Sequence, residues 1–108
     1  MEDLGFREMQ EIQRELQEKY KDQWEPVTPE EGKNKLLWLM IELGEVADII
    51  KKDGDRRIME DNATREHFTE ELCDVLMYFN DVMLCYGLSV EELREAYLKK
   101  HQRNLKRW

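Results

Sequence analysis

The 108-residue chain contains few of the residues that interrupt or cross-link a fold: five Gly, two Pro and two Cys. So little turn chemistry argues against an all-β fold, which needs a turn after each short strand, and favours helices. No run of apolar residues approaches the roughly 20 needed to cross a membrane. The first residues do not have the pattern of a signal peptide, so we expect none. We therefore expect no membrane association.

Basic residues are also in the minority, with 17 Lys and Arg against 25 Asp and Glu and a formal net charge of −8. A protein that binds duplex nucleic acid needs a basic face to neutralise phosphates, so we expect no such partner. Residues 1–98 hold all 25 acids and 12 of the bases, whereas the last ten residues, KKHQRNLKRW, hold five bases and no acid. The helix dipole favours such a basic helix end, so the tail needs no binding role by itself.

The two cysteines, Cys73 and Cys85, lie 12 residues apart in a segment that we expect to form one helix. At about 1.5 Å per residue they would be about 18 Å apart, which is too far for a disulfide. Free thiols and the lack of an export signal favour a cytoplasmic location.

Apolar residues make up 41% of the chain, which is typical of a folded protein, and the length suits a single domain over residues 1–108. Their helical spacing predicts an all-α fold with four helices. The expected ranges are about 3–20, 29–53 and 64–86, followed by a helix from 89 that continues into the basic tail. The buried face of the first helix should consist of Phe6, Met9, Ile12, Leu16 and Tyr20.

Cap signals predict where these helices begin and end. Thr28 and Glu31 match a capping box at the start of the second helix, and Gly54 matches a C-cap at its end. The polar stretch that follows, GDRRIMEDNA, is expected to be a connecting segment. Gly87 should stop the third helix, and Ser89 should cap the fourth.

The second expected helix is apolar on nearly every side, because eleven of the fifteen residues from Leu36 to Ile50 are apolar. A helix of that kind is normally buried. Glu42, Glu45 and Asp48 nevertheless share one sector of about 120° on it. These carboxylates therefore lie among apolar residues and not on a charged outer face.

The third expected helix repeats the pattern, with Glu71 and Asp74 in one polar stripe between apolar residues. Each helix thus carries a carboxylate pair at i, i+3, namely Glu42-x-x-Glu45 and Glu71-x-x-Asp74. A buried carboxylate must be ion-paired, protonated or bound to a metal, and basic residues are scarce in both spans. Facing carboxylate pairs would make an all-oxygen site suited to Mg²⁺ or Mn²⁺. The alternative is a stripe that faces solvent and serves solubility.

The histidines and cysteines argue against two other kinds of metal site. A di-iron carboxylate bundle needs Glu-x-x-His motifs, but the residues three before His67 and His101 are Thr64 and Leu98. A zinc site is unsupported because the Cys and His residues lack ligand spacing. We expect both histidines to be ordinary surface residues.

The two apolar segments with their acidic pairs, KNKLLWLMIELGEVADIIKKDGD and EELCDVLMYFNDVMLCYG, together resemble the MazG-type nucleotide pyrophosphohydrolases. This family belongs to the all-α NTP pyrophosphatase superfamily, with dCTP pyrophosphatase and the dimeric dUTPases. The resemblance runs from about Trp24 to the C-terminus and rests on E-x-x-E followed about 26 residues later by E-x-x-D. It implies a four-helix, MazG-like bundle that assembles as a homodimer or as a dimer-of-dimers tetramer.

The resemblance also implies an activity, which is hydrolysis of a nucleoside triphosphate to a monophosphate and pyrophosphate for cleansing of the nucleotide pool. Glu45 and Glu42 would be the catalytic carboxylates. The implied ligands of Mg²⁺, or of Mn²⁺ in its place, are Glu42, Glu45, Glu71 and Asp74. The implied substrate-binding residues are Trp24, Asn34, Tyr78, Lys100, Asn104 and Arg107.

Two other functions stay open at this point: a non-catalytic oligomeric helical adaptor, and a nucleotide-sensing module. Independently of the resemblance, two helices that are apolar on nearly all sides exceed what a four-helix chain can cover. The excess should be buried between copies of the chain, so we expect a homo-oligomer.

Overall fold

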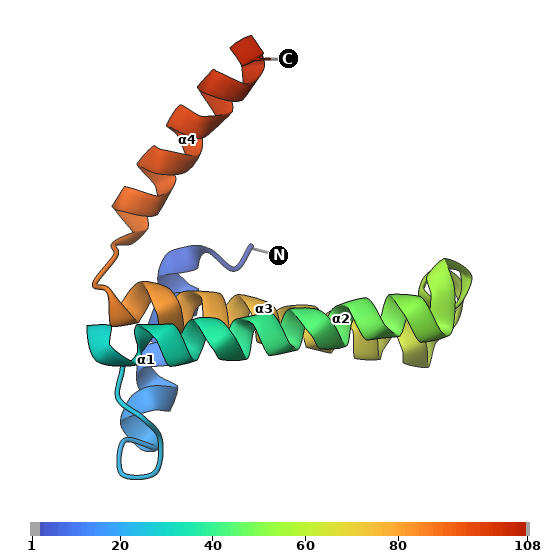
Figure 1. The fold of residues 1–108 in the computed structure, drawn as a ribbon, viewed down its shortest axis with the longest axis horizontal. Helices are drawn as coiled ribbons and strands as arrows, with labels where there is room; N and C mark the ends of the chain where they lie inside the picture. Colours follow the sequence, from blue (N-terminus) through green and yellow to red (C-terminus); the bar gives the residue numbers. More distant parts are fainter. Residues whose placement is uncertain (1–2, 108) are drawn as a thin grey trace.

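The computed structural model describes residues 3–107. Within that range the chain forms four α-helices and no strand: α1 (Phe6–Lys19), α2 (Gly32–Glu60), α3 (Asn62–Cys85) and α4 (Val90–Arg107), with a short 3₁₀ turn, η1 (Pro29–Glu31), before α2. Figure 1 shows α2 and α3 side by side and antiparallel, α1 crossing them, and α4 apart from all three. The expectation of an all-α chain with four helices is confirmed.

The connection between α2 and α3 is shorter than expected, because α2 ends at Glu60 and α3 begins at Asn62. Gly54 interrupts the helix where a C-cap was expected, with φ 83° and ψ 162°, but the prediction that the residues after it form a connecting segment is wrong, because the chain continues as helix to Glu60. A positive φ of this kind is tolerated by glycine because it has no Cβ. The chain then reverses at Asp61, whose Oδ2 accepts hydrogen bonds from Thr64 N (3.0 Å) and Thr64 Oγ1 (2.7 Å). This N-cap starts α3 at Asn62, two residues before the expected start.

Two of the other expected helix ends are confirmed and one is not. Gly87 adopts a positive φ of 62° just after α3, and Ser89 Oγ accepts a hydrogen bond from Glu92 N at 3.0 Å at the start of α4. The expected capping box is not formed, because Thr28 makes no side-chain cap hydrogen bond. Glu31 Oε2 instead accepts from Asn34 Nδ2 at 2.9 Å.

The face that α1 buries against α3 differs from the expected apolar stripe. Its three buried residues are glutamines at i, i+3 and i+7: Gln10, Gln13 and Gln17, which are 2%, 4% and 8% exposed. Ile12, a member of the expected stripe, is 46% exposed. The crossing of α1 over α3 therefore places amide side chains, and not alkyl ones, deepest in this interface.

The last helix leaves the body of the molecule. An ion pair between Arg7 and Glu91 joins its first turn to α1, and beyond it α4 extends away from the other helices (Figure 1). Tyr97, Leu98 and Leu105 are 73%, 47% and 64% exposed along it. The four helices of one chain thus do not close a bundle.

The buried apolar core of the described chain is small, and most apolar residues of α2 and α3 remain exposed. Five hydrophobic side chains are buried, namely Val46, Ile49, Ile58, Met83 and Cys85. The exposed ones on α2 and α3 are Leu36, Leu37, Trp38, Met40, Ile41, Leu43, Ile50, Met59, Leu72, Leu76 and Met77. The expectation that these helices are buried on nearly all sides therefore does not hold within a single chain.

Two smaller expectations can be compared with the structure. Neither cysteine is bridged: Cys73 is exposed and Cys85 is buried, and both are free thiols. No helix among residues 3–107 has both the length and the apolar character required to cross a bilayer.

Candidate functional site

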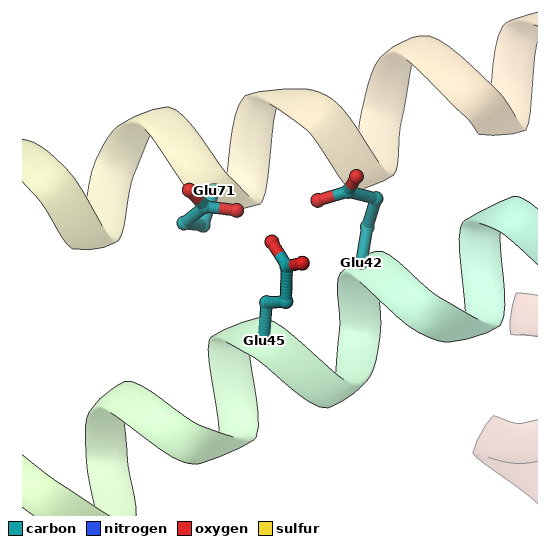
Figure 2. Close-up of side chains that lie close together, drawn as sticks. All are labelled: Glu42, Glu45 and Glu71. Atoms are coloured by element: carbon teal, nitrogen blue, oxygen red, sulfur yellow. The ribbon is translucent and has the colours of Figure 1, made fainter.

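Three glutamates from α2 and α3 converge in the space between these helices. Glu42 and Glu45 lie one turn apart on the same face of α2, and the antiparallel hairpin places Glu71 of α3 opposite them (Figure 2). One carboxylate oxygen from each lies within 4.8 Å of the others. The structure thus brings together three of the four expected metal ligands, and we call this group the carboxylate cluster.

The carboxylate cluster contains buried oxygens that lack a partner. Glu42 Oε2 and Glu71 Oε2 are both buried and make no hydrogen bond. Burial, and next the charges of Glu45 and Asp74, raise the pKa of Glu42 to about 7. Burial also raises the pKa of Glu71, followed by its interaction with Glu45. Glu42 therefore holds a proton near neutral pH that an isolated glutamate would release, and a cation would take the place of that proton.

Few cationic groups of the described chain lie beside these carboxylates. His67 Nδ1 lies 3.9 Å from Glu71 Oε1, which is an ion pair only when the imidazole is protonated. His67 is on the surface as expected, but its position one turn before Glu71 on α3 was not anticipated. The oxygens present are of the kind that Mg²⁺ and Mn²⁺ bind, and their unpartnered lone pairs fit such an ion.

Asp74, the fourth expected ligand, lies at the edge of this group. Its carboxylate is not among the three that converge, but its charge contributes to the raised pKa of Glu42 and of Glu71. Asp74 also lines a pocket beside the cluster, with a cavity volume of about 370 Å³. It therefore connects the carboxylate cluster with this pocket.

Aromatic side chains line the same pocket. The rings of Trp38 and Tyr78 stack with their centroids 6.3 Å apart and their planes 13° apart. Burial, followed by the charge of Glu42, raises the pKa of the Tyr78 hydroxyl. Trp24, which is 39% exposed, also lines the pocket and stacks on Tyr20 with a centroid distance of 4.6 Å. The structure thus places two expected substrate-binding residues, Trp24 and Tyr78, in the wall of one pocket, which Asp74 also lines.

The other four expected substrate-binding residues lie elsewhere. Asn34 is exposed, donates to Glu31 and is not part of the pocket wall. Lys100, Asn104 and Arg107 belong to the second half of α4, which extends away from α2 and α3 (Figure 1). Within one chain these three implied substrate-binding residues therefore lie away from the cluster, because the chain changes direction between Gly87 and Ser89.

Several residues of the pocket were not among the site residues expected from the sequence. Asp81 is 4% exposed, and its Oδ1 accepts hydrogen bonds from Gln13 Nε2 (2.8 Å) and Gln17 Nε2 (3.3 Å). Burial raises the pKa of Asp81, whereas Gln13, Lys35 and Gln17 lower it. Lys35 is 8% exposed and lines the pocket, as does Trp38. The detectable signal was the i, i+3, i+7 spacing of glutamines on the first helix, which is unusual for a face that becomes buried.

Comparisons of the chain with protein-family models, with curated proteins and with solved structures found no match.

Proposed function

We propose that this chain is a Mg²⁺-dependent nucleoside triphosphate pyrophosphohydrolase of MazG type that acts as a homo-oligomer. The observation that carries the proposal is the carboxylate cluster, in which two buried glutamate oxygens accept no hydrogen bond from any donor outside the cluster, and an aromatic pocket adjoins them. A purely structural role does not account for such oxygens, because unpartnered buried polar atoms reduce stability. The resemblance of both acidic motifs to the MazG family supplies the reaction.

In the proposed reaction, the oxygen of a water molecule bonds to the α-phosphorus, and the bond from that phosphorus to the bridging oxygen of the β-phosphate breaks. The products are a nucleoside monophosphate and pyrophosphate. Mg²⁺ bound by the cluster, or Mn²⁺ in its place, would supply positive charge that offsets the phosphate oxygens. Glu42, Glu45 and Glu71 would hold this ion, with Asp74 at the margin.

The glutamates themselves would position the water and accept its proton. Glu45 is the most exposed of the three and faces the gap between the helices, so water reaches its carboxylate. Glu42 lies one turn away and has a pKa of about 7, which suits a group that holds or releases a proton at neutral pH. Catalysis would otherwise depend on positioning and electrostatics, as in other phosphoryl transfers.

The exposed apolar surfaces support the homo-oligomer. Monomeric soluble proteins rarely expose large contiguous apolar patches, and α2, α3 and α4 all carry exposed apolar side chains. A dimer or dimer-of-dimers tetramer would cover them. Assembly would also give the basic half of α4 a second chain to meet, so Lys100 and Asn104 would reach a triphosphate only across a subunit boundary. A cytoplasmic role in cleansing the nucleotide pool is the cellular counterpart of this proposal.

The exposed apolar surface also favours a second candidate function, a non-catalytic oligomeric adaptor. A nucleotide-sensing module would share the pocket but not the reaction. Incubation with a panel of ribo- and deoxyribonucleoside triphosphates and Mg²⁺ separates the three. The enzyme should release pyrophosphate as its primary product, and Glu45→Gln should abolish the release. An adaptor should show neither binding nor turnover, and a sensor should bind without turnover. Orthophosphate as the primary product would contradict the pyrophosphohydrolase.

A further inference from the structure

The floor of the 370 Å³ pocket is built from polar side chains that are almost completely buried. Gln13, Gln17, Lys35 and Asp81 all line it and are all 8% exposed or less. They come from three helices, α1, α2 and α3, so their meeting depends on the whole fold. This floor is separate from the carboxylate cluster, and Asp74 lies between the two.

Burying polar and charged side chains costs folding free energy, because they lose their hydration, and apolar packing around them does not offset that loss. A buried carboxylate is normally ion-paired, protonated or bound to a ligand. Among the described residues, Asp81 forms no salt bridge: its hydrogen bonds come from the two neutral amides of Gln13 and Gln17, and the charge of Lys35 acts on it only from a greater distance, lowering its pKa. Alkyl side chains at these positions would hold α1 on α3 at least as well. The polar floor is therefore best explained by a ligand that it contacts.

The hydrogen-bonding capacity of the floor indicates which edge of a ligand it fits. Both glutamines use an amide N–H on Asp81 Oδ1, which leaves their carbonyl oxygens and Asp81 Oδ2 as acceptors. Each glutamine also keeps its second N–H, and the ammonium of Lys35 adds cationic donors at the same pocket. Asp81 is the group of this floor that can only accept hydrogen bonds when ionised, so its free Oδ2 matches a ligand edge that presents N–H groups.

The walls of the pocket indicate the shape of the ligand. Trp38 and Tyr78 form one aromatic wall, Trp24 contributes a second ring, and the remaining lining includes Leu16 and Met77. Stacking on aromatic rings is the usual way in which proteins hold a planar base. A planar ring held here would lie within reach of Asp74 and hence next to the carboxylate cluster.

We propose that this pocket binds the nucleobase of the substrate, and that Asp81, held in place by Gln13 and Gln17, selects bases that carry an exocyclic amino group. The proposal rests on the proposed function, because it places the base of the same nucleotide beside the carboxylates that would receive its phosphates. A carboxylate accepts a hydrogen bond from an amino group but is repelled by a carbonyl oxygen at the same position. Bases with an amino group there are therefore attracted, and bases with a carbonyl group there are repelled.

Two ligand pairs test this selection in the absence of metal, since monophosphates need no hydrolysis to bind. CMP and UMP differ at the amino or carbonyl group of C4, and GMP and IMP differ by the 2-amino group. Titration calorimetry of the full chain with EDTA should show CMP and GMP binding about tenfold or more tightly than UMP and IMP, as expected for one charged hydrogen bond. Quenching of tryptophan fluorescence by CMP should accompany binding, because Trp24 and Trp38 line the pocket.

Asp81→Asn should reduce both preferences to within about twofold, because an amide presents one donor and one acceptor. The matched control is Asp48→Asn, which makes the same chemical change on α2 at a half-exposed carboxylate paired with Lys52 at 2.9 Å. The control should keep both preferences. Gln17→Leu, which removes an acceptor from the floor, should weaken binding of CMP and GMP and provides a second variant if Asp81→Asn does not fold.

Each outcome decides between the base pocket and a structural network. Equal binding of CMP and UMP, and of GMP and IMP, overturns the selection. Absence of binding of any monophosphate at millimolar concentration, both with EDTA and with Mg²⁺ added to offset the phosphate charge, overturns the pocket. A purely structural network predicts that Asp81→Asn lowers the melting temperature without changing any preference. If the chain binds monophosphates selectively but hydrolyses no triphosphate, the base pocket stands and the pyrophosphohydrolase proposal is refuted. If it hydrolyses triphosphates without discriminating among bases, the pyrophosphohydrolase proposal stands and the base selection is refuted.

Discussion

Replacing Glu42 with Gln should make the metal-free protein more stable than the wild type at neutral and alkaline pH. Burial and the charges of Glu45 and Asp74 raise the pKa of Glu42 from 4.5 to about 7. Because the folded pKa lies above the unfolded value, the folded state keeps a proton that the unfolded chain releases. The stability linked to Glu42 is therefore complete below about pH 4.5 and is lost as the pH rises through about 7.

The magnitude follows from the difference between the two pKa values. At about 1.4 kcal/mol for each pH unit between them, full conversion would cost the wild type about 3 kcal/mol. Glu42 is only partly buried, so solvent screening reduces this to about 1–2 kcal/mol. For a chain of this length that corresponds to about 4–10 °C in melting temperature. Glu42→Gln carries no titrating group at this position and should escape the loss.

Thermal unfolding followed by circular dichroism between pH 4.5 and 8.5, with EDTA and at fixed protein concentration, measures this difference. The melting temperature of Glu42→Gln minus that of the wild type should rise with pH, whereas Glu66→Gln, which removes an exposed carboxylate from α3, should show no such trend. Mg²⁺ at a hundredfold excess over its dissociation constant should add about 2.7 kcal/mol to the wild type. A Glu42→Gln protein that melts below the wild type at pH 8 without metal would refute the reasoning.

Three further predictions concern the margin of the site, the last helix and the assembly. Asp74→Asn should abolish turnover and reduce the Mg²⁺-induced rise in melting temperature, while the metal-free variant should be at least as stable as the metal-free wild type at pH 8. A lower melting temperature combined with a full Mg²⁺ response would contradict a role of Asp74 at the site. Lys100→Ala combined with Asn104→Ala should lower kcat/KM for triphosphates about tenfold or more with an unchanged melting temperature, and an unchanged kcat/KM would leave α4 without a substrate role. Light scattering at micromolar concentration should give a dimer or tetramer, and a 13.2 kDa particle would exclude it.

Much of the local structure could be predicted from the sequence because it depends on neighbours along the chain. Sparse Gly and Pro, together with apolar residues at helical spacing, indicate four helices, and the structure has them. Gly87 and Ser89 act at the positions that their chemistry suggests, because a positive φ and a side-chain cap are satisfied within three residues. The residues between Gly54 and Asp61 were mispredicted as a connection, since their largely polar composition is equally compatible with final helical turns that face solvent.

The carboxylate cluster divides between what the sequence determined and what the tertiary structure decided. Helical spacing by itself places Glu42 beside Glu45 on α2, because residues three apart share a helix face. That spacing says nothing of how far α3 is shifted along α2. The reversal at Asp61 sets this shift, and it brings Glu71 to the two glutamates while Asp74 lies towards the pocket.

The buried faces and the path of the last helix were likewise decided only by the tertiary structure. An apolar stripe predicts the buried face of a helix only when its partner is apolar, and α1 instead meets Asp81 of α3, so that Gln13 and Gln17 are buried and Ile12 is exposed. Periodicity also predicts that α4 exists but not where it points. Its direction depends on the backbone between Gly87 and Ser89 and on the surface that α4 packs against. Within one chain the ion pair from α1 holds the first turn of α4, and the rest of the helix extends away from the other helices.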